Sequence, residues 1–285
     1  MIAVVDYQKG NLKSVERGLI AAGGEALITA DASEIAKADA IVLPGVGAFA
    51  DAAATMCELG QMEAICDRVR AGVPFLGICL GEHLMFEHGV EGAPEGNPAC
   101  GLGLLPGTVV AMPRYDAQGK AFKVPHVGWN TIEISACSGG REAVAVPPCG
   151  EGGGNAVLSS GGAGGGAARS SAAKRGLFEH GAFPGSAPQV GSELAFPDST
   201  PQPESNLAFA CPLFDSIAPG EYFYFTHSYI APTGSHTIAE TTHSVRFTSA
   251  VQYGDRAFGV QFHPEKSSDA GARVLANFVA IAARG

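Results

Sequence analysis

The residues with the clearest chemical potential lie in segment 77–81, Gly-Ile-Cys-Leu-Gly, which follows an apolar run. The run predicts a buried strand, and the residues after it predict a helix over 82–88. A cysteine framed by glycines at such a strand-to-helix turn is typical of a nucleophile elbow, where the chain turns sharply and the side chain stays uncrowded. The positive end of the following helix would favour the thiolate of Cys79. A buried structural cysteine is the open alternative.

A base for this nucleophile is available in His263, which stands two residues before Glu265. Residues two apart in an extended segment point to the same side, so the two side chains can lie together. The carboxylate would then hold the imidazole in its productive tautomer and stabilise the imidazolium. A His-x-Glu pair alone is more often a solvated strand end. Together with a glycine-framed cysteine, it favours nucleophilic catalysis.

A third segment, Pro-Gly-Val-Gly at 44–47, follows another apolar run. A glycine turn at the end of a strand can present a backbone N–H group to a developing oxyanion, although such loops are commonly only turns. Active sites of open α/β sheets gather beyond the carboxyl ends of the strands. Because all three segments follow predicted strands, we expect them to meet at one edge of a sheet.

The elements that would position these residues alternate between short apolar runs and amphipathic stretches of helical length. This alternation predicts an α/β fold with an open, mostly parallel, twisted sheet flanked by helices. Strands are expected at 2–5, 40–43, 73–78, 222–225, 245–247 and 258–262, and helices at 11–22, 56–69 and 270–283.

Composition fits one large domain with a long insertion. The chain has 285 residues, 46% of them hydrophobic, which is enough to bury a core and excludes wholesale disorder. Of its 39 glycines, 15 lie in 137–210, a stretch that is also rich in Ala, Ser and Pro. We interpret 137–210 as a low-complexity, largely disordered insertion in a single domain spanning 1–285. A genuine second domain in this stretch is the alternative.

Charge and cysteine usage restrict the function classes. A net charge of −10 argues against a nucleic-acid partner, and no apolar run is long enough to span a membrane. The first residues lack a basic region and predict a strand in place of a signal peptide, and the seven irregularly spaced cysteines do not suggest a disulfide framework. A cytoplasmic protein is therefore expected.

Neither a metal nor another cofactor is expected. Cys137, Cys149, Cys211 and His180 lack the close pairs of a zinc site. No glycine-rich nucleotide motif occurs in the required context. His227, His236 and His243 recur at intervals that fit neither a ligand set nor a relay, so we interpret them as surface or core histidines.

Six segments together resemble the class I, triad-type glutamine amidotransferases, most closely the glutaminase subunits of imidazole glycerol phosphate synthases. The resemblance covers roughly 1–135 and 211–285. It rests on Asp6-Tyr7 with Gly10-Asn11-Leu12 and Ser14-Val15, on Leu43–Phe49, Gly77–Gly81, Lys123–Asn130 and Phe225–Tyr229, and on Gly259–Ser268.

The resemblance implies a glutaminase with glutamine as substrate. Cys79 would attack the side-chain amide and form a thioester, His263 would transfer protons, and Glu265 would orient His263. The backbone N–H groups of Gly47 and Leu80 would form the oxyanion hole. Glutamine binding would involve His83, Ser228 and Tyr229.

The resemblance also implies a heterodimer with a cyclase subunit, a (β/α)₈ barrel. The barrel would receive the ammonia and form imidazole glycerol phosphate and an aminoimidazole carboxamide ribonucleotide in histidine biosynthesis. The residues that would face this partner are Gly10, Asn11, His126, Trp129, Asn130, Tyr224 and Lys266.

Two departures from the family pattern stand out. Glu82 and His83 occupy positions where the family usually has Met-Gln, and that glutamine helps to bind the substrate. His83 cannot reproduce the paired hydrogen bonds of an amide, so we expect retained activity with weaker glutamine binding. Gln8 stands where glycine is common, and a small effect on the turn is expected.

Two rival functions stay open at this point. One is the glutaminase of pyridoxal phosphate synthesis, which segment 126–130 and Lys266 disfavour. The other is a degenerate subunit that only supports its partner. The intact Cys79, His263 and Glu265 disfavour that reading.

Overall fold

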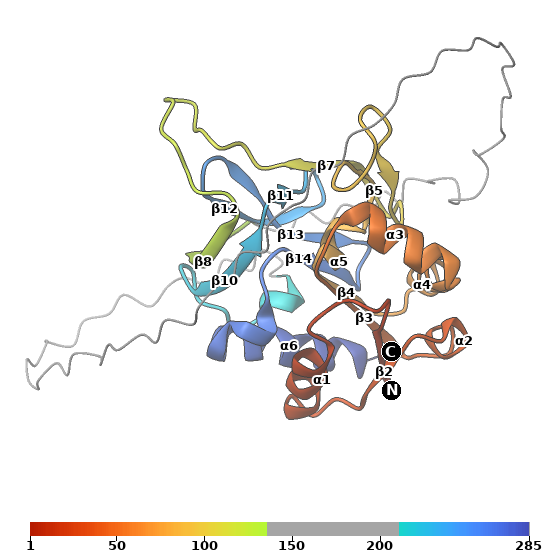
Figure 1. Ribbon diagram of the computed structural model, residues 1–285. Helices are drawn as coiled ribbons and strands as arrows, with labels where there is room; N and C mark the ends of the chain where they lie inside the picture. The colour runs from red at the N-terminus through yellow and green to blue at the C-terminus, as the bar shows by residue number, and fades with distance from the viewer. Residues whose placement is uncertain (136–210, 285) are drawn as a thin grey trace, which may run out of the picture. The chain divides into compact units, whose positions relative to one another are not determined.

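The computed structural model describes residues 1–135 and 211–284, which form a mixed β-sheet with helices on both faces and two smaller sheets (Figure 1). The predicted insertion at 137–210 lies outside the described residues, so its disorder stays a prediction. The central sheet has eight strands in the order β2 (Ala26–Thr29), β1 (Ile2–Val5), β3 (Ala40–Gly45), β4 (Phe75–Cys79), β14 (Ala257–Val260), β13 (Arg246–Tyr253), β12 (Thr237–Thr242) and β9 (Glu133–Ile134).

The sheet is parallel in its first part and antiparallel in its last. Strands β2, β1, β3, β4 and β14 pair in parallel, whereas β13, β12 and β9 add antiparallel pairings. The expectation of an α/β fold with a mostly parallel sheet is thus confirmed. The antiparallel extension was not predicted.

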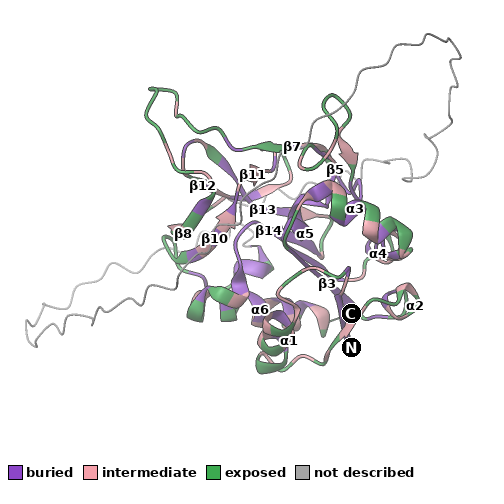
Figure 2. Cartoon of the chain, in the orientation of Figure 1, coloured by how far each residue is buried: buried purple, intermediate pink, exposed green. Residues whose placement is uncertain are grey.

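Alternating side chains of the central strands supply two separate cores. Ile2 and Val4 of β1 face one core, and Ala3 and Val5 face the other. Helices α1 (Leu12–Ala21) and α6 (Ser268–Ala282) cover the first core, and α2 (Ala32–Ile35), α3 (Phe49–Glu58) and α4 (Gln61–Arg70) cover the second. Figure 2 shows the central strands as the most continuously buried part of the chain.

Two small sheets stand beside the central one. Strand β8 (His126–Thr131) pairs antiparallel with β10 (Tyr222–His227), and the other sheet has the order β11 (Tyr229–Ile230), β7 (Leu105–Ala111), β5 (Phe86–Gly89), β6 (Ala99–Cys100). Short 3₁₀ turns occupy Pro212–Phe214 and Pro264–Lys266. One turn of helix, α5 (Leu80–His83), follows β4.

Two predicted helices are wrong in extent. The helix expected at 56–69 is divided into α3 and α4, because Gly60 adopts a φ of 68°, in the left-handed region. The helix expected at 82–88 ends with α5 at His83, since the chain enters β5 at Phe86. The other predicted strands and helices are confirmed with ends displaced by at most two residues, except that the strand expected at 245–247 extends to Tyr253. No helix within 1–135 and 211–284 combines the length and apolarity needed to cross a bilayer.

Candidate active site

The three candidate segments, at 44–47, 77–81 and 263–265, meet at the carboxyl ends of adjacent parallel strands. Gly45 at the end of β3 pairs with Cys79 at the end of β4, and Val260 of β14 pairs with Ile78. His263 follows β14 by a few residues, so it comes to the same edge. The sheet register therefore brings together the elbow, the glycine turn and the His-Pro-Glu segment as the sequence predicts.

Cys79 has the strained backbone of a nucleophile elbow. Its φ is 54° and its ψ is −105°, in a region where a non-glycine residue costs about 1–3 kcal/mol. The flanking glycines are sterically required. A Cβ on Gly81 would collide with the carbonyl oxygen of Leu43, and one on Gly77 would collide with the backbone of Gly81. The tight turn thus depends on glycine on both sides of the cysteine.

His263 and Glu265 form a buried pair beside Cys79. The Nδ1 atom of His263 lies 3.0 Å from Oε1 of Glu265, and each side chain is only 2% exposed. Asn11 donates a further hydrogen bond of 3.3 Å from Nδ2 to the same carboxylate oxygen. The Nε2 atom of His263 has no hydrogen-bond partner within the described chain. It is therefore available for proton transfer.

The electrostatics of the pair favour a charged imidazolium. Burial opposes a charge on His263, but the interactions with the Cys79 thiolate and the Glu265 carboxylate outweigh it and raise the pKa of His263 to about 9. Burial also opposes ionisation of Glu265, yet the hydrogen bonds from His263 and Asn11 and the positive charge of His263 lower the pKa of this carboxyl. The site is thus arranged to hold a proton on the imidazole while the carboxylate stays ionised.

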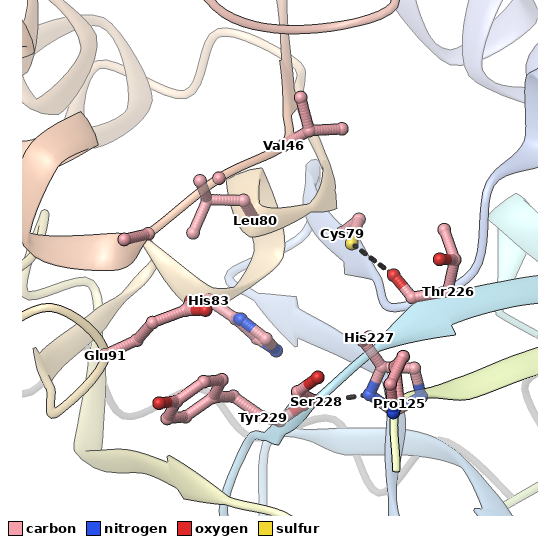
Figure 3. A pocket seen from close by; sticks show the side chains of 12 residues that line it. Val46, Cys79, Leu80, His83, Glu91, Pro125, Thr226, His227, Ser228 and Tyr229 are labelled. Atoms are coloured by element: carbon pink, nitrogen blue, oxygen red, sulfur yellow. Dashed lines mark hydrogen bonds between the residues drawn. The ribbon is translucent and has the colours of Figure 1, made fainter. Parts of the chain in front are cut away.

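The sulfur of Cys79 has two polar neighbours besides His263. The thiol lies 3.9 Å from the backbone carbonyl of Thr226, which accepts its hydrogen bond (Figure 3). Nε2 of Gln261 donates to the sulfur across 3.7 Å, and Oε1 of Gln261 lies 2.7 Å from Nε2 of His83. The role of Gln261 was not recognised in the sequence.

Cys79 opens into a pocket of about 470 Å³. All the residues predicted to form the oxyanion hole or to bind glutamine line this pocket, together with a few that were not predicted. The lining consists of Val46, Gly47, Ala48, Cys79, Leu80, His83, Glu91, Pro125, Thr226, His227, Ser228 and Tyr229. In Figure 3, Cys79 and Glu91 lie at opposite sides of the pocket and His83 lies between them.

Glu91 supplies the carboxylate of the pocket lining and was missed in the sequence. Burial, together with the charge of Asp51, raises its pKa, whereas a hydrogen bond from the backbone of Phe49 lowers it. A single glutamate in a loop has no spacing pattern that could have revealed it. Its place in the pocket is a product of the tertiary fold.

Glu82 is buried with neither carboxylate oxygen hydrogen-bonded within the described chain. It packs under β14, where its Cγ approaches Gly259. Burial raises its pKa well above the ordinary value. Glu82 therefore lies in the core and outside the pocket lining, where burial favours its neutral form.

Four of the residues predicted to face a partner, His126, Trp129, Asn130 and Tyr224, lie on β8 and β10, whereas Gly10 and Asn11 precede α1. Trp129 is directly opposite Tyr224 in the β8–β10 ladder, with ring centroids 6.0 Å apart, and Nζ of Lys266 lies 5.9 Å from the centroid of the Tyr224 ring. Gly10, Trp129 and Lys266 are exposed, and Asn11, Asn130 and Tyr224 are half-buried.

His126 differs from the other predicted partner residues because it is only 5% exposed. Its Nδ1 lies 3.1 Å from Nε2 of His227, and its ring stacks on His243 at 4.2 Å. The sequence spacing did not indicate this cluster, because the three histidines come from separate segments. Within the described residues, no group of His, Cys, Asp or Glu side chains is arranged to hold a metal ion.

Comparisons with known proteins identify the family of the chain. A family profile described as "Glutamine amidotransferase class-I" matches residues 3–141 and 197–282. The chain is 31% identical to the imidazole glycerol phosphate synthase subunit HisH of Syntrophotalea carbinolica over 280 residues, which cover 98% of both chains. It is 33% identical to the subunit of the same name from Moorella thermoacetica, over 97% of this chain and 93% of that relative.

Solved structures share the fold at low identity. A structure titled "Crystal structure of glutamine amidotransferase" aligns with a TM-score of 0.55 and 14% identity, over 99% of this chain and 98% of that one. PurLQS from Thermotoga maritima aligns with a TM-score of 0.53 and 14% identity, over 98% and 97% of the two chains. By sequence, the chain belongs to the class-I glutamine amidotransferase family, among the HisH subunits of imidazole glycerol phosphate synthases.

Proposed function

We propose that the chain is the glutaminase subunit of an imidazole glycerol phosphate synthase. It hydrolyses glutamine to glutamate and ammonia, and a cyclase partner uses the ammonia in histidine biosynthesis. The observation that carries the proposal is the buried His263–Glu265 pair beside Cys79, at the mouth of a pocket with a carboxylate on its other side. The family to which the chain belongs supports the same reaction.

The first half-reaction forms a thioester. Cys79 and His263 enter as a thiolate–imidazolium pair, with the thiol proton on Nε2 of His263, and the sulfur attacks the side-chain carbonyl carbon of glutamine. The carbonyl oxygen becomes an oxyanion, which the backbone N–H groups of Leu80 and Gly47 stabilise. The imidazolium then gives its proton to the amide nitrogen, the C–N bond breaks, and ammonia leaves. The raised pKa of His263, about 9, supports its role as the proton carrier.

The second half-reaction regenerates the enzyme. Water attacks the γ-glutamyl thioester while His263 accepts a proton from it, and a second oxyanion forms in the same hole. The C–S bond then breaks, glutamate leaves, and the thiolate–imidazolium pair is restored. Glu265 stays ionised throughout and orients the ring through Nδ1, 3.0 Å away.

Recognition of glutamine requires protein groups that complement its positive α-ammonium group and its negative α-carboxylate. We assign the α-ammonium group to Glu91, the carboxylate in the pocket lining, because an ammonium group there finds an ionic partner. Ser228 and Tyr229 would bind the α-carboxylate from β11 and the residue before it. His83 lies between the two ends of the pocket.

The partner surface is the exposed side of β8 and β10. Large apolar side chains gather there, with Val127, Trp129 and Tyr222 each more than half exposed, at 54%, 51% and 58%. Such a patch is typical of a protein–protein interface. Gly10, Asn11, Asn130, Tyr224 and Lys266 would extend it, and the buried His126 would act through Asn130, 3.4 Å from its ring.

This surface has a direct backbone link to the triad. The N–H group of His263 donates to the carbonyl of Tyr224 across 2.9 Å, and the N–H group of Tyr224 is bonded to Oγ of Ser267. A partner that shifts β10 would therefore move His263. We also propose a cytoplasmic location, since a reducing compartment keeps the Cys79 thiol available.

The test is ammonia release from glutamine by the full chain, alone and with the cyclase subunit and its ligand. Cys79→Ala should lower the rate at least about 10³-fold, and the matched variant of an exposed cysteine, Cys57→Ala, should not. Ammonia release that persists in Cys79→Ala would overturn the proposed mechanism. Full activity without the cyclase would overturn the coupling to a partner.

A further inference from the structure

The side chain of Gln261 bridges Cys79 and His83 inside the protein. Gln261 follows β14, its backbone N–H donates to Ser249 across 3.0 Å, and its side chain is fully buried. Its Nε2 lies 3.7 Å from the sulfur of Cys79, and its Oε1 lies 2.7 Å from Nε2 of His83. The three side chains therefore form a continuous polar chain that ends at the sulfur.

We propose that Gln261 is a positioning residue that stabilises the thiolate of Cys79 by hydrogen bonding, and that His83 acts through Gln261 by fixing the orientation of its amide. The inference deepens the proposed function and rests on it, because it concerns the same nucleophile. It assigns His83 a role in orienting Gln261, in place of direct substrate binding.

The direction of each hydrogen bond follows from the chemistry of a thiolate. A thiolate only accepts hydrogen bonds, so the amide nitrogen of Gln261 must face the sulfur and the amide oxygen must face His83. That oxygen also only accepts, so Nε2 of His83 must carry a proton. Burial lowers the pKa of His83 to about 4, despite the opposing bond to Gln261, so the ring is neutral at pH 7 and has only this one proton. Nδ1 of His83 is then left as an acceptor.

This arrangement explains how a histidine can occupy position 83. The bond from Nε2 to Gln261 requires one donor, which either a neutral histidine or a glutamine amide supplies. A glutamine at position 83 would therefore preserve the orientation of Gln261. An aliphatic residue would not, because the buried amide oxygen would lose its donor and the amide could turn its oxygen towards the sulfur.

Other titratable groups surround Cys79 and stay in place in the variants below. Tyr7 follows β1 and is close enough for the charge of Cys79 to raise its pKa, after burial as the main cause. His263 with Glu265 comes from the segment after β14, His227 comes from β10, and Glu82 precedes His83 on α5. A change in the fraction of Cys79 present as thiolate can therefore be attributed to the substituted residue.

The test is the pH dependence of Cys79 alkylation by iodoacetamide, measured on the full chain without glutamine between about pH 5 and pH 10. Mass spectrometry of the Cys79 peptide separates this reaction from alkylation of the exposed Cys57 and Cys100. Gln261→Met removes the donor while keeping the side-chain length. It should raise the midpoint of the profile by about one pH unit, a tenfold loss of thiolate near neutral pH. Gln61→Met, which alters a buried glutamine bonded to Asp6 and Ala30, is the matched control and should leave the midpoint unchanged.

His83 variants test the second step. His83→Leu should raise the midpoint by about half a pH unit, and His83→Gln should restore it, because only the second variant supplies a donor to Gln261. An unchanged midpoint in folded Gln261→Met overturns the proposal. If circular dichroism shows that Gln261→Met does not fold, an unchanged midpoint in His83→Leu overturns it instead.

Alkylation needs no turnover, so this test and that of the proposed function can fail separately. Shifted midpoints in a chain that releases no ammonia from glutamine would reject the glutaminase and keep the role of Gln261. Normal glutamine hydrolysis with unshifted midpoints would reject the role of Gln261 alone.

Discussion

Two buried carboxyl groups on either side of the Cys79 elbow are in opposite electrostatic states. Glu265, in the segment after β14, is hydrogen-bonded to His263 and Asn11, and these partners lower its pKa. Glu82, on the helical turn after β4, has no hydrogen-bond partner among the described residues, and burial raises its pKa well above the ordinary value. Burial is similar at the two positions, so the partners decide which carboxyl is charged.

The comparison distinguishes a carboxyl group that serves catalysis, Glu265, from one that serves packing, Glu82. The segment after β14 holds a negative charge where an imidazolium must be stabilised. The turn after β4 holds a neutral acid against Gly259, a position that the reaction does not use. Isosteric replacement of each carboxyl group by an amide should therefore have unequal consequences.

The largest expected difference is in catalysis. Glu265→Gln should lower kcat/KM for glutamine by about 10²- to 10⁴-fold, because an amide neither stabilises the imidazolium nor enforces the tautomer of His263. Glu82→Gln should change it by less than about threefold, since it replaces a neutral acid by a neutral amide. Steady-state ammonia release in the presence of the cyclase measures both. Equal losses in the two variants would remove the distinction.

The next difference is in the pH dependence of stability. The pKa of Glu82 is raised on folding from an ordinary value of 4.5, so its contribution is fully present below that pH and declines as the pH rises towards the folded-state value. Glu82→Gln abolishes this decline. The variant should match the wild type near pH 4.5 and become progressively more stable than it as the pH rises from there to the folded-state pKa, as measured by urea denaturation.

Glu265 should show the opposite trend. Its pKa is lowered on folding, so its contribution is present above its ordinary value of 4.5 and is lost as the pH falls through the folded-state value. The wild type should therefore gain stability over Glu265→Gln on going from acidic to neutral pH. Urea denaturation of both variants at several pH values measures these trends. If the stability of both variants relative to the wild type changed in the same direction with pH, the assignment of opposite charge states would be contradicted.

The smallest expected effect concerns two residues with positive φ angles. Cys79 and Gln8 both have positive φ angles, of 54° and 70°, but only Cys79 presents a reacting atom. Gln8→Gly should stabilise the fold by about 1 kcal/mol by relieving the left-handed strain, without a loss of glutamine hydrolysis. Thermal unfolding checks the first part. A lower melting temperature would show that the Gln8 side chain contributes more than the strain costs.

The sequence predicts the parts of the site that depend on local chain geometry. The elbow at Cys79 and the His263–Glu265 pair each lie within a few residues, so glycine spacing and extended-chain alternation reveal them. The apolar runs of β1, β3, β4 and β14 likewise predict the parallel strands. Their shared edge follows from the rule that parallel strands end together.

The remaining features depend on contacts between distant segments. Glu91 reaches the pocket from a loop and Gln261 reaches Cys79 from a strand end, neither with a motif of its own, and the His126–His227 contact joins two strands. Glu82 was expected near the elbow, but whether its side chain faced the pocket or the core depended on packing against Gly259. Gly60 broke an amphipathic pattern that otherwise predicted one helix over 56–69.

The most direct test of the account is detection of the covalent intermediate. Acid quenching of the full chain with glutamine and the cyclase, followed by mass spectrometry, should find a γ-glutamyl group on the Cys79 peptide. It should be absent in Cys79→Ala and should accumulate less in Glu265→Gln than in the wild type. Glutamine hydrolysis with the acyl group on another residue, or with no acyl-enzyme under conditions where hydrolysis of the thioester limits the rate, would contradict a Cys79–His263–Glu265 glutaminase.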